Sequence, residues 1–403
     1  MISVPSAPSR LQSFAGRSDA LAKLRLGLIC DFAEENWPSM DLVADMLWHQ
    51  LQARVPDYLC PGRIQPRMVR RFRRLPLFGY NRFARNADRL LSRFWDYAHL
   101  VRRQRDDFDC FHIADHSYAH LVHVLPGDRT GVYCHDLDTF RCLLEPQVEP
   151  RPLWFRAMTR RILHGMQQAA VVFCSTRVTI DRISKFGLID AARLIYAPYG
   201  IAPEFTTPTD SIDKEIHAVK GPFLLHVGSC IPRKRIDILL EVFAAVRRKR
   251  PELDLVQVGG QWTAAQQRQI EQHRLGPAIR QLRGLDRKSL AALYRRAALV
   301  LLPSQAEGFG LPVIEALACG AVVVASDIPV LREVGGDGAI YCPVANISGW
   351  VDTINRLLTS PDFDPDRCTR ISQARRFSWE NHAAIIIEAY QKLASGVCVR
   401  ARS

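Results

Sequence analysis

The chain of 403 residues lacks any hydrophobic run long enough to cross a bilayer. A membrane-spanning helix needs roughly 18 or more apolar residues in succession, and the longest apolar runs here, such as residues 297–303, have only the length of a strand. Residues 1–20 also lack the apolar stretch of a signal peptide. We therefore expect the chain to remain in the cytoplasm.

The sequence also lacks the cysteine patterns of a disulfide-rich or zinc-binding protein. Its 11 cysteines are scattered from Cys30 to Cys398, and no two of them form a Cys-x-x-Cys pair. No set of cysteines and histidines has the spacing of a zinc finger. We expect reduced, mostly buried thiols and no metal site.

Acidic residues are scarce relative to basic ones, with 41 Asp and Glu against 54 Lys and Arg, so the formal net charge is +13. The excess is concentrated in residues 61–105, where thirteen arginines and interleaved aromatic residues accompany only Asp88 and Asp96. Such a segment suits an anionic membrane surface, a phosphorylated acceptor or nucleic acid; the alternative is a solvated basic face over an internal aromatic core. Because the sequence has no helix-turn-helix, RNP-type or zinc motif, we expect no nucleic-acid partner.

Strand-like and helix-like segments alternate in two successive halves of the chain. In the first half, strands are predicted at 24–32, 110–113, 131–138, 169–176 and 193–201, and helices at 41–54, 114–126 and 179–186. In the second half, strands are predicted at 221–229, 253–260, 279–285, 298–304, 321–327 and 338–343, and helices at 237–250, 264–275, 287–296 and 311–318. Residues 206–219, which are polar, form the predicted linker between the halves.

This alternation predicts an α/β fold of two doubly wound, parallel-sheet, Rossmann-like domains that face a cleft. Strands separated by helices of 10–15 residues form parallel sheets with right-handed crossovers. We predict a first domain at 1–203 and a second at 204–376. In such sheets ligands bind outside the carboxyl ends of the strands, so the loops that follow the strands are the candidate sites.

The loop at 227–235, VGSCIPRKR, leaves a predicted strand and enters a predicted helix. Gly228 allows the backbone to approach a ligand closely, and Arg233, Lys234 and Arg235 cluster beside the start of the helix. Basic groups at a helix N-terminus form a suitable seat for a pyrophosphate. For this loop alone, a surface turn with solvated charges is the alternative.

A second loop at 304–320, SQAEGFGLPVIEALACG, opens the predicted helix at 311–318. Gly308 and Gly310 permit a tight turn with exposed amides. Glu307 precedes the helix, and Glu315 falls about one turn into it, with its carboxylate expected near the cleft. Two carboxylates on either side of a helix N-terminus could hold the hydroxyls of one sugar ligand. The loop fails as a dinucleotide-binding fingerprint, because its glycines do not continue as Gly-x-Gly-x-x-Gly.

Taken together, the two loops resemble the signature of retaining GT-B glycosyltransferases, specifically glycosyltransferase family 4. Glu307 and Glu315, separated by seven residues within EGFGLPVIEALACG, carry the resemblance together with VGSCIPRKRIDILLEVF and LRGLDRKSLAALYRRAALVLLPS. The first half is similar only through short segments: HDLD at 135–138, STRVTIDRI at 175–183 and APYGI at 197–201. FSWENHAAIIIEAYQKL resembles the family's C-terminal helix, which implies that residues 377–395 return to the first domain.

The resemblance implies an enzyme that moves a hexose from a UDP- or GDP-sugar to a saccharide or lipid-linked acceptor. Anomeric configuration would be retained, and neither a metal nor another cofactor is expected. The implied setting is cell-surface polysaccharide, lipopolysaccharide or glycolipid synthesis, with the basic segment 61–105 attaching the chain to the inner face of the plasma membrane. Two alternatives are a non-catalytic, basic sugar-nucleotide or membrane-binding protein of the same fold, and an epimerase or phosphorylase with the same two domains.

The resemblance also implies roles for single residues on the donor side. Lys234 and Arg233 would neutralise the donor diphosphate as the glycosidic bond breaks. Glu307 would hold hydroxyls of the donor sugar, and Glu315 would accept hydrogen bonds from the ribose of the nucleotide. His135 would lie near the reacting sugar.

The remaining implied contacts involve backbone amides and the first half of the chain. The loop residues Gly228, Ser229 and Gly308 belong to the implied donor site, and the amides of Phe309, Gly310 and Leu311 would face the phosphate and sugar. Many relatives have Arg where this chain has Ser229, so Arg233 would substitute for it. The resemblance does not supply the acceptor contacts, because the first loop reads ENWPSM and lacks the Gly-Gly pair of the family; we expect these contacts at Glu35, Trp37, Ser39, Asp115 and His116.

Overall fold

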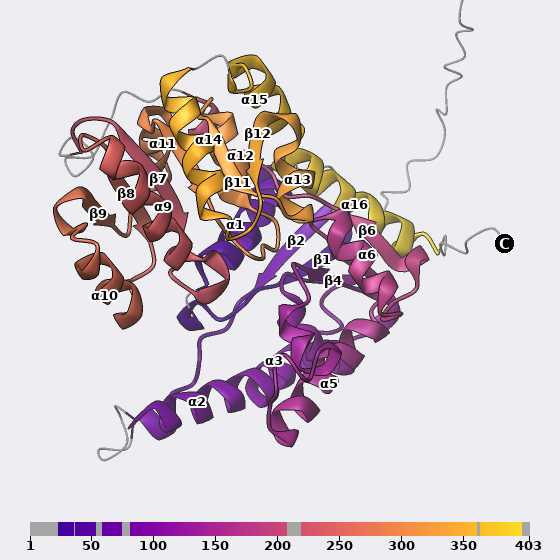
Figure 1. Cartoon of the computed structure of the whole chain (residues 1–403). Helices are drawn as coiled ribbons and strands as arrows, with labels where there is room; N and C mark the ends of the chain where they lie inside the picture. Colours follow the sequence, from indigo (N-terminus) through magenta and orange to yellow (C-terminus); the bar gives the residue numbers. More distant parts are fainter. Residues whose placement is uncertain are drawn as a thin grey trace, which may run out of the picture.

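The described residues form two six-stranded parallel sheets, each covered by helices (Figure 1). The computed structural model describes residues 23–35, 37–53, 59–74, 81–207, 219–360 and 363–396. The prediction of two doubly wound, Rossmann-like parallel-sheet domains is confirmed. Most of the linker predicted at 206–219 lies outside the described residues, since 208–218 are not among them.

The first sheet has the strand order β2-β1-β3-β4-β5-β6. Its strands are β1 (Leu24–Ile29), β2 (Leu59–Ile64), β3 (Cys110–Ile113), β4 (Thr130–Cys134), β5 (Val171–Cys174) and β6 (Leu194–Tyr196). The helices of this unit are α1 (Pro38–Ala53), α2 (Arg82–Leu91), α3 (Tyr97–Arg103), α4 (Arg141–Leu144), α5 (Leu153–Gln168) and α6 (Arg177–Lys185). Helix α7 (Pro203–Thr206) follows β6 and packs on helices of the second unit. Strands β3, β4 and β5 are buried along their whole length, which explains why their sequences are apolar apart from the buried His112 and Thr130.

The second sheet has the order β12-β11-β10-β7-β8-β9. Its strands are β7 (Phe223–Gly228), β8 (Asp254–Gly259), β9 (Ile279–Leu282), β10 (Leu299–Leu302), β11 (Val323–Ser326) and β12 (Ala339–Cys342). Its helices are α9 (Ile236–Lys249), α10 (Ala264–Gln272), α11 (Arg287–Arg296), α12 (Leu311–Ala318), α13 (Pro329–Gly335), α14 (Ile347–Thr359) and α15 (Arg367–Ala374). The predicted helices at 287–296 and 311–318 are confirmed at both ends.

The strand order reverses direction once in each sheet, between β1 and β3 and between β7 and β10. At such a switch point the loops from neighbouring strands leave to opposite faces of the sheet and open a crevice for a ligand. The loops that follow β1, β3, β7 and β10 are therefore the candidate positions for a ligand-binding site.

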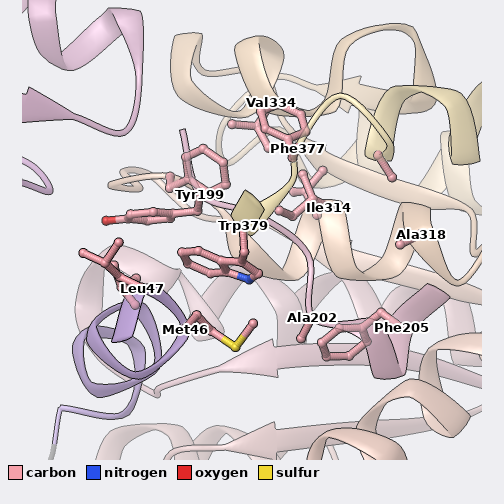
Figure 2. Close-up of a cluster of buried hydrophobic side chains, with 14 of the residues drawn as sticks. Met46, Leu47, Tyr199, Ala202, Phe205, Ile314, Ala318, Val334, Phe377 and Trp379 are labelled. Carbon is pink, nitrogen blue, oxygen red and sulfur yellow. The ribbon is translucent and has the colours of Figure 1, made fainter. Parts of the chain in front are cut away.

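The C-terminal helix α16 (Trp379–Ala394) packs on the first unit, although it follows the second in sequence (Figure 1). His382 Nδ1 lies 3.0 Å from the carbonyl oxygen of Pro198, and the hydroxyl of Tyr390 donates to the carbonyl of Phe111 at 2.8 Å. Buried apolar side chains from both units meet at the start of this helix. Figure 2 shows them on α1, on the connection after β6, on α12 and on α16, among them Met46, Leu47, Tyr199, Phe205, Ile314 and Trp379.

Several local predictions differ from the structure. The strand predicted at 193–201 is only β6 (Leu194–Tyr196), because the residues after Tyr196 form the connection that leads to α7. The strand predicted at 131–138 ends at Cys134, because the chain turns after β4 and places residues 135–138 in a loop. The helix predicted at 114–126 is the 3₁₀ helix η4 (His116–Val124), whose tighter turns the apolar pattern does not distinguish from an α-helix. The helix predicted at 41–54 begins earlier, at Pro38. No helix within the described ranges combines the length and hydropathy needed to cross a bilayer.

Candidate functional site

The candidate residues of the two units lie on loops at the carboxyl edges of their sheets. In the second unit, the loop after β7 carries Arg233 and Lys234, and the loop after β10 carries Glu307. In the first unit, the loop after β3 carries Asp115, and the loop after β4 carries His135. The second unit therefore uses the loops at its strand-order switch point, and the first unit uses loops at and beside its own.

An ion pair between Lys234 and Glu307 joins the two loops of the second unit. The ammonium of Lys234 lies 2.6 and 2.8 Å from the two carboxylate oxygens of Glu307, whose side chain is only 4% exposed. Ser304 donates a hydrogen bond to the same carboxylate at 2.6 Å, and Arg233 Nη1 lies 3.6 Å from it. Burial alone would raise the pKa of Glu307, but the charge of Lys234 and the hydrogen bonds from Lys234 and Ser304 lower it. Glu307 is therefore held as a carboxylate with both oxygens engaged.

Helix α12 begins directly after Gly310, at a position where only glycine fits without strain. Gly310 has a φ of 96°, and a Cβ atom there would lie 2.8 Å from a methyl group of Leu331. The preceding Phe309 is buried, and its ring lies 4.7 Å from the ring of Tyr199 in the first unit. Leu311 begins the helix, so the amides of residues 309–311 lie at its positive end.

Gly308 brings the two units into contact beside the candidate site. A Cβ atom at this position would lie 3.2 Å from the carboxylate of Asp136 and 3.3 Å from the carbonyl oxygen of His135. In the loop after β7, the carbonyl of Gly228 accepts a hydrogen bond from Gly260 N at 3.1 Å, and Ser229 is exposed. The structure thus brings the loops after β4 and β10 together across the interface.

Glu315 lies on α12 but is buried, whereas the sequence predicts its carboxylate near the cleft. Tyr294 on α11 donates its hydroxyl hydrogen to Glu315 Oε2 at 3.0 Å. Burial raises the pKa of Glu315 to about 7, although the Tyr294 hydrogen bond and the charge of Arg287 oppose the rise. Its contact with a ribose stays a prediction.

His135 is buried directly after β4 and is uncharged at neutral pH. Its Nδ1 pairs with the hydroxyl of Tyr199, and its backbone N–H lies 3.4 Å from Nδ1 of His116. Burial lowers the pKa of His135 to about 4, although the negative charge of Asp115 opposes the shift. The remaining ring nitrogen, Nε2, has no hydrogen-bond partner within the part of the chain that the structure describes. A neutral imidazole with one uncommitted nitrogen can donate or accept a hydrogen bond there.

Asp115 and His116 lie next to each other at the carboxyl edge of the first sheet. Asp115 accepts hydrogen bonds from the backbone N–H and the hydroxyl of Ser117, at 2.7 and 2.8 Å. Burial alone would raise the pKa of Asp115, but the imidazoles of His116 and His135 and the Ser117 N–H lower it. His116 Nε2 lies 3.0 Å from the Thr139 hydroxyl oxygen.

Sequence reasoning missed Asp31, which follows β1 and belongs to the same edge. Burial raises the pKa of Asp31 well above its usual range, and the charge of Asp115 raises it further. One of its carboxylate oxygens has no partner among the described residues. The sequence offered one signal for Asp31, because an acidic residue stands at the end of the first apolar run. Sequence reasoning also missed Tyr199, for which the sequence offered no signal.

The three acceptor candidates that follow β1 are placed differently from one another. The side chain of Glu35 is 1% exposed, and Arg89 and Arg93 hold it at 2.7 and 3.5 Å. In this arrangement Glu35 holds the two arginines in place. Its contact with an acceptor stays a prediction. Trp37 and Ser39 are both exposed at the start of α1.

A cleft of about 740 Å³ lies between the units beside these loops. The arginines that line it come from both units: Arg141 and Arg182 from the first, Arg233 and Arg235 from the second. Asp138, Glu145 and Asp237 also line it, and Arg141 and Arg235 pair with the last two of these. Arg182 and Arg233 are therefore the lining arginines that these carboxylates leave to face an anionic group. Within the described residues, no group of three or more His, Cys, Asp or Glu side chains is arranged to hold a metal ion.

Comparison with known proteins finds a matching family model and relatives with similar sequences. Residues 209–394 match the family model "Glycosyl transferases group 1". The chain is 28% identical over 273 residues to a D-inositol 3-phosphate glycosyltransferase of Paenarthrobacter aurescens, which covers 64% of this chain and 66% of that protein. It is 26% identical over 298 residues to the serotype-specific mannosyltransferase WbdA of Escherichia coli, which covers 69% of this chain and 36% of that protein.

Solved structures share the architecture of the whole chain. Sucrose-phosphate synthase from Thermosynechococcus elongatus superimposes with a TM-score of 0.70 at 18% identity, covering 93% of this chain and all of that one. Anabaena Alr3699/HepE in complex with UDP superimposes with a TM-score of 0.67 at 15% identity, covering 92% and 100%. The fold is therefore that of the GT-B glycosyltransferases. The two sequence relatives are glycosyltransferases, and the chain spans 66% and 36% of their lengths.

Proposed function

We propose that the chain is a retaining glycosyltransferase that moves a hexose from a UDP- or GDP-sugar to a saccharide or lipid-linked acceptor. The observation that carries this proposal is the buried Lys234–Glu307 pair, with the carboxylate held at 2.6 Å, at the carboxyl edge of the second sheet and beside the N-terminus of α12. A cation and a helix N-terminus at one point favour a diphosphate. The Alr3699/HepE structure, which shares this fold, was solved in complex with UDP, and this supports a nucleotide ligand for the chain.

The donor would bind mainly to the second unit. Its diphosphate would lie against Lys234, Arg233 and the amides of residues 309–311, whose positive charge would offset the charge that develops as the diphosphate leaves. Glu307 would orient Lys234 and accept hydrogen bonds from sugar hydroxyls at the oxygen lone pairs that remain. Glu315, whose Oε2 already binds Tyr294, would bind the ribose through its other oxygen.

The first unit would present the acceptor to the reacting carbon. His135 would contribute Nε2 as a neutral hydrogen-bonding group, because Nδ1 is paired with Tyr199. Asp115 and His116 would contact the acceptor from the neighbouring strand end. Closure of the cleft over both substrates would exclude water from the reaction.

The proposed chemistry breaks the bond between the anomeric carbon and the diphosphate oxygen, and forms a bond from the acceptor oxygen to the same face of that carbon. The acceptor proton passes to an oxygen of the departing diphosphate. Because Glu307 is occupied by Lys234 and Ser304, it is a poor nucleophile, which favours an oxocarbenium-like transition state over a covalent intermediate. Lys234 and Arg233 supply the positive charge, so the proposal needs no metal.

The relatives suggest a setting for this activity. One of them, an Escherichia coli protein 26% identical over 275 residues, is an O-antigen chain mannosyltransferase B, and the chain covers 71% of it. We extend this to propose a role in the synthesis of a cell-surface polysaccharide or glycolipid.

The test uses purified protein and a panel of UDP- and GDP-hexoses in which the sugar is α-linked. Slow hydrolysis of the donor is followed by proton NMR, which distinguishes the two anomers of the released sugar before they equilibrate. The proposal predicts release of the α anomer by the wild-type protein and its loss in Lys234→Met, but not in Arg248→Ala, an exposed residue of the same unit. Release of the β anomer would refute retention. Nucleotide binding without hydrolysis of any donor would favour the non-catalytic sugar-nucleotide-binding alternative, and neither binding nor hydrolysis would leave the membrane-binding one.

A further inference from the structure

A helical arm extends from the first unit beyond its sheet. Helix α2, the π-helical segment η3 (Ser92–Asp96) and α3 follow one another without interruption from Arg82 to Arg103. Figure 1 shows α2 running outward from α3, away from the strands. We call residues 66–74 and 81–96 the basic arm.

Hydrogen bonds hold the two parts of the basic arm together. The buried carboxylate of Asp88 accepts hydrogen bonds from the backbone N–H groups of Arg71, Phe72 and Arg73, at 3.0, 2.8 and 3.2 Å. The hydroxyl oxygen of Ser92 accepts another from the backbone of Val69 at 3.0 Å. Burial alone would raise the pKa of Asp88, but these three N–H groups lower it, so the anchor stays charged.

Large apolar side chains of the basic arm face solvent. Phe83 is 78% exposed and Trp95 is 74% exposed. The arm contributes six of the twelve exposed large hydrophobic residues in the described chain: Val69, Phe72, Phe83, Leu90, Leu91 and Trp95. Phe83, Leu90 and Leu91 lie on one face of α2, because their spacing of seven and eight residues is two turns. Such a concentration of exposed apolar area marks an interaction surface.

Uncompensated arginines surround these apolar groups. Of the thirteen arginines at 61–105, five form ion pairs with carboxylates of the described chain: Arg63, Arg71, Arg89, Arg93 and Arg105. The other eight form no such pair there: Arg67, Arg70, Arg73, Arg74, Arg82, Arg85, Arg102 and Arg103. An exposed apolar strip beside arginines matches the interface of a bilayer that carries anionic lipids.

The basic arm is also joined directly to the carboxyl edge of the first sheet. Arg89 and Arg93 enclose the carboxylate of Glu35, which follows β1. Arg93 donates a further hydrogen bond to the carbonyl of Ser117 at 2.5 Å, and Ser117 in turn binds Asp115. Arg93 lies in the π-helical segment, a feature that often occurs at functional positions in helices.

We propose that the basic arm docks this chain on an anionic membrane surface. Phe83, Leu90 and Trp95 enter the headgroup region, and the unpaired arginines bind lipid phosphates. Through Arg89 and Arg93, docking holds the carboxyl edge of the first sheet near the bilayer, where a lipid-linked acceptor would be presented. The docking itself does not depend on sugar transfer; only the statement about the acceptor rests on the proposed function.

The test is co-sedimentation with vesicles of phosphatidylcholine alone or with about one third phosphatidylglycerol, at two ionic strengths. We expect binding to the anionic vesicles that weakens with salt, and little binding to the neutral ones. Phe83→Ser should weaken binding, whereas Phe363→Ser, which replaces an exposed phenylalanine of the second unit, should not. Arg82→Ala/Arg85→Ala should lower the partition coefficient roughly 25-fold, whereas Arg248→Ala/Lys249→Ala, two exposed cations of α9, should change it little.

Circular dichroism melts confirm that each variant is folded, and nucleotide binding measured without vesicles reports on the second unit separately. Equal binding to neutral and anionic vesicles would overturn the proposal, as would equal weakening by both pairs of variants. Binding of an oligonucleotide that depends on Arg82 and Arg85, without binding to anionic vesicles, would overturn it in favour of nucleic acid. Vesicle binding that persists when no nucleotide binds would leave the docking supported and the proposed transfer function refuted.

Discussion

The Lys234–Glu307 pair makes a prediction that separates its structural role from its catalytic one. The perturbation is a double-mutant cycle with Lys234→Met, Glu307→Gln and the double variant. Each single substitution leaves one member of a buried pair without its partner. The double variant removes both charges while nearly preserving the side-chain volumes.

The expected loss of stability follows from the burial of both side chains, since Lys234 is 10% exposed and Glu307 is 4% exposed. Breaking a buried pair costs about 3–5 kcal/mol, because the remaining charge is left without compensation. For a unit of this size, a loss of about 3 kcal/mol corresponds to a decrease in Tm of about 10 °C. In Lys234→Met only the Ser304 hydrogen bond and the charge of Arg233 still oppose the effect of burial, which raises the pKa of Glu307, so the destabilisation should be larger at pH 8 than at pH 5.

The assay combines thermal melts of the four proteins with donor turnover. The double variant should melt closer to the wild type than the sum of the single effects predicts, with a coupling of about 2 kcal/mol or more. The two variants that lack Lys234 should nevertheless lose about 100-fold or more in kcat/KM, because the charge on the leaving diphosphate is no longer offset. Glu307→Gln should lose a similar factor for another reason, because the carboxylate that orients Lys234 and would bind the sugar hydroxyls is gone. Additive melting effects, or a double variant that regains activity together with stability, would refute this reasoning.

Two further predictions concern α12. Because burial raises the pKa of Glu315 to about 7 from an ordinary value of 4.5, its neutral form is favoured in the folded state, and its contribution to stability is lost as the pH rises from about 4.5 to 7. The free energy of unfolding of Glu315→Gln, measured by urea titration, should therefore rise by up to about 3 kcal/mol relative to that of the wild type between pH 5 and pH 8. A difference between the two proteins that stays constant over this pH range would contradict the argument. Gly310→Ala should lower stability by about 1–3 kcal/mol and weaken nucleoside diphosphate binding, because φ is 96° and Leu331 leaves no space for a Cβ atom. An unchanged melt would show that the turn relaxes freely.

The alternation of strands and helices could be predicted because each apolar run reports burial in a sheet that helices cover on both faces. The helices at 287–296 and 311–318 were predicted at both ends, since Asp286 caps the first and Gly310 and Pro312 mark the start of the second. The end of β4 was predicted too late, because Leu137, an apolar residue that follows the polar His135 and Asp136, is buried in the loop after the strand and not in the strand itself.

The local composition of the candidate site was predictable, but its pairings were not. Glycines, basic residues and carboxylates at strand ends indicate the loops when two such loops occur together, although each alone is also typical of a solvated surface turn. The contact between Lys234 and Glu307 spans 73 residues, and it depends on β7 and β10 being neighbours in the sheet. The pairing of His135 with Tyr199 depends in the same way on the order of β4, β5 and β6.

Nucleotide binding at the loops after β7 and β10 is the central claim, and thermal-shift titration with UDP, GDP and their sugars tests it most directly. A ligand that binds the folded state raises its stability by RT ln(1 + [L]/Kd), so about 1 mM ligand with a Kd of about 10 μM adds roughly 2.7 kcal/mol. The account predicts a clear increase in Tm with one of the two bases, lost in Lys234→Met and kept in Arg248→Ala. No shift with any nucleotide, or an equal shift in Lys234→Met, would contradict it.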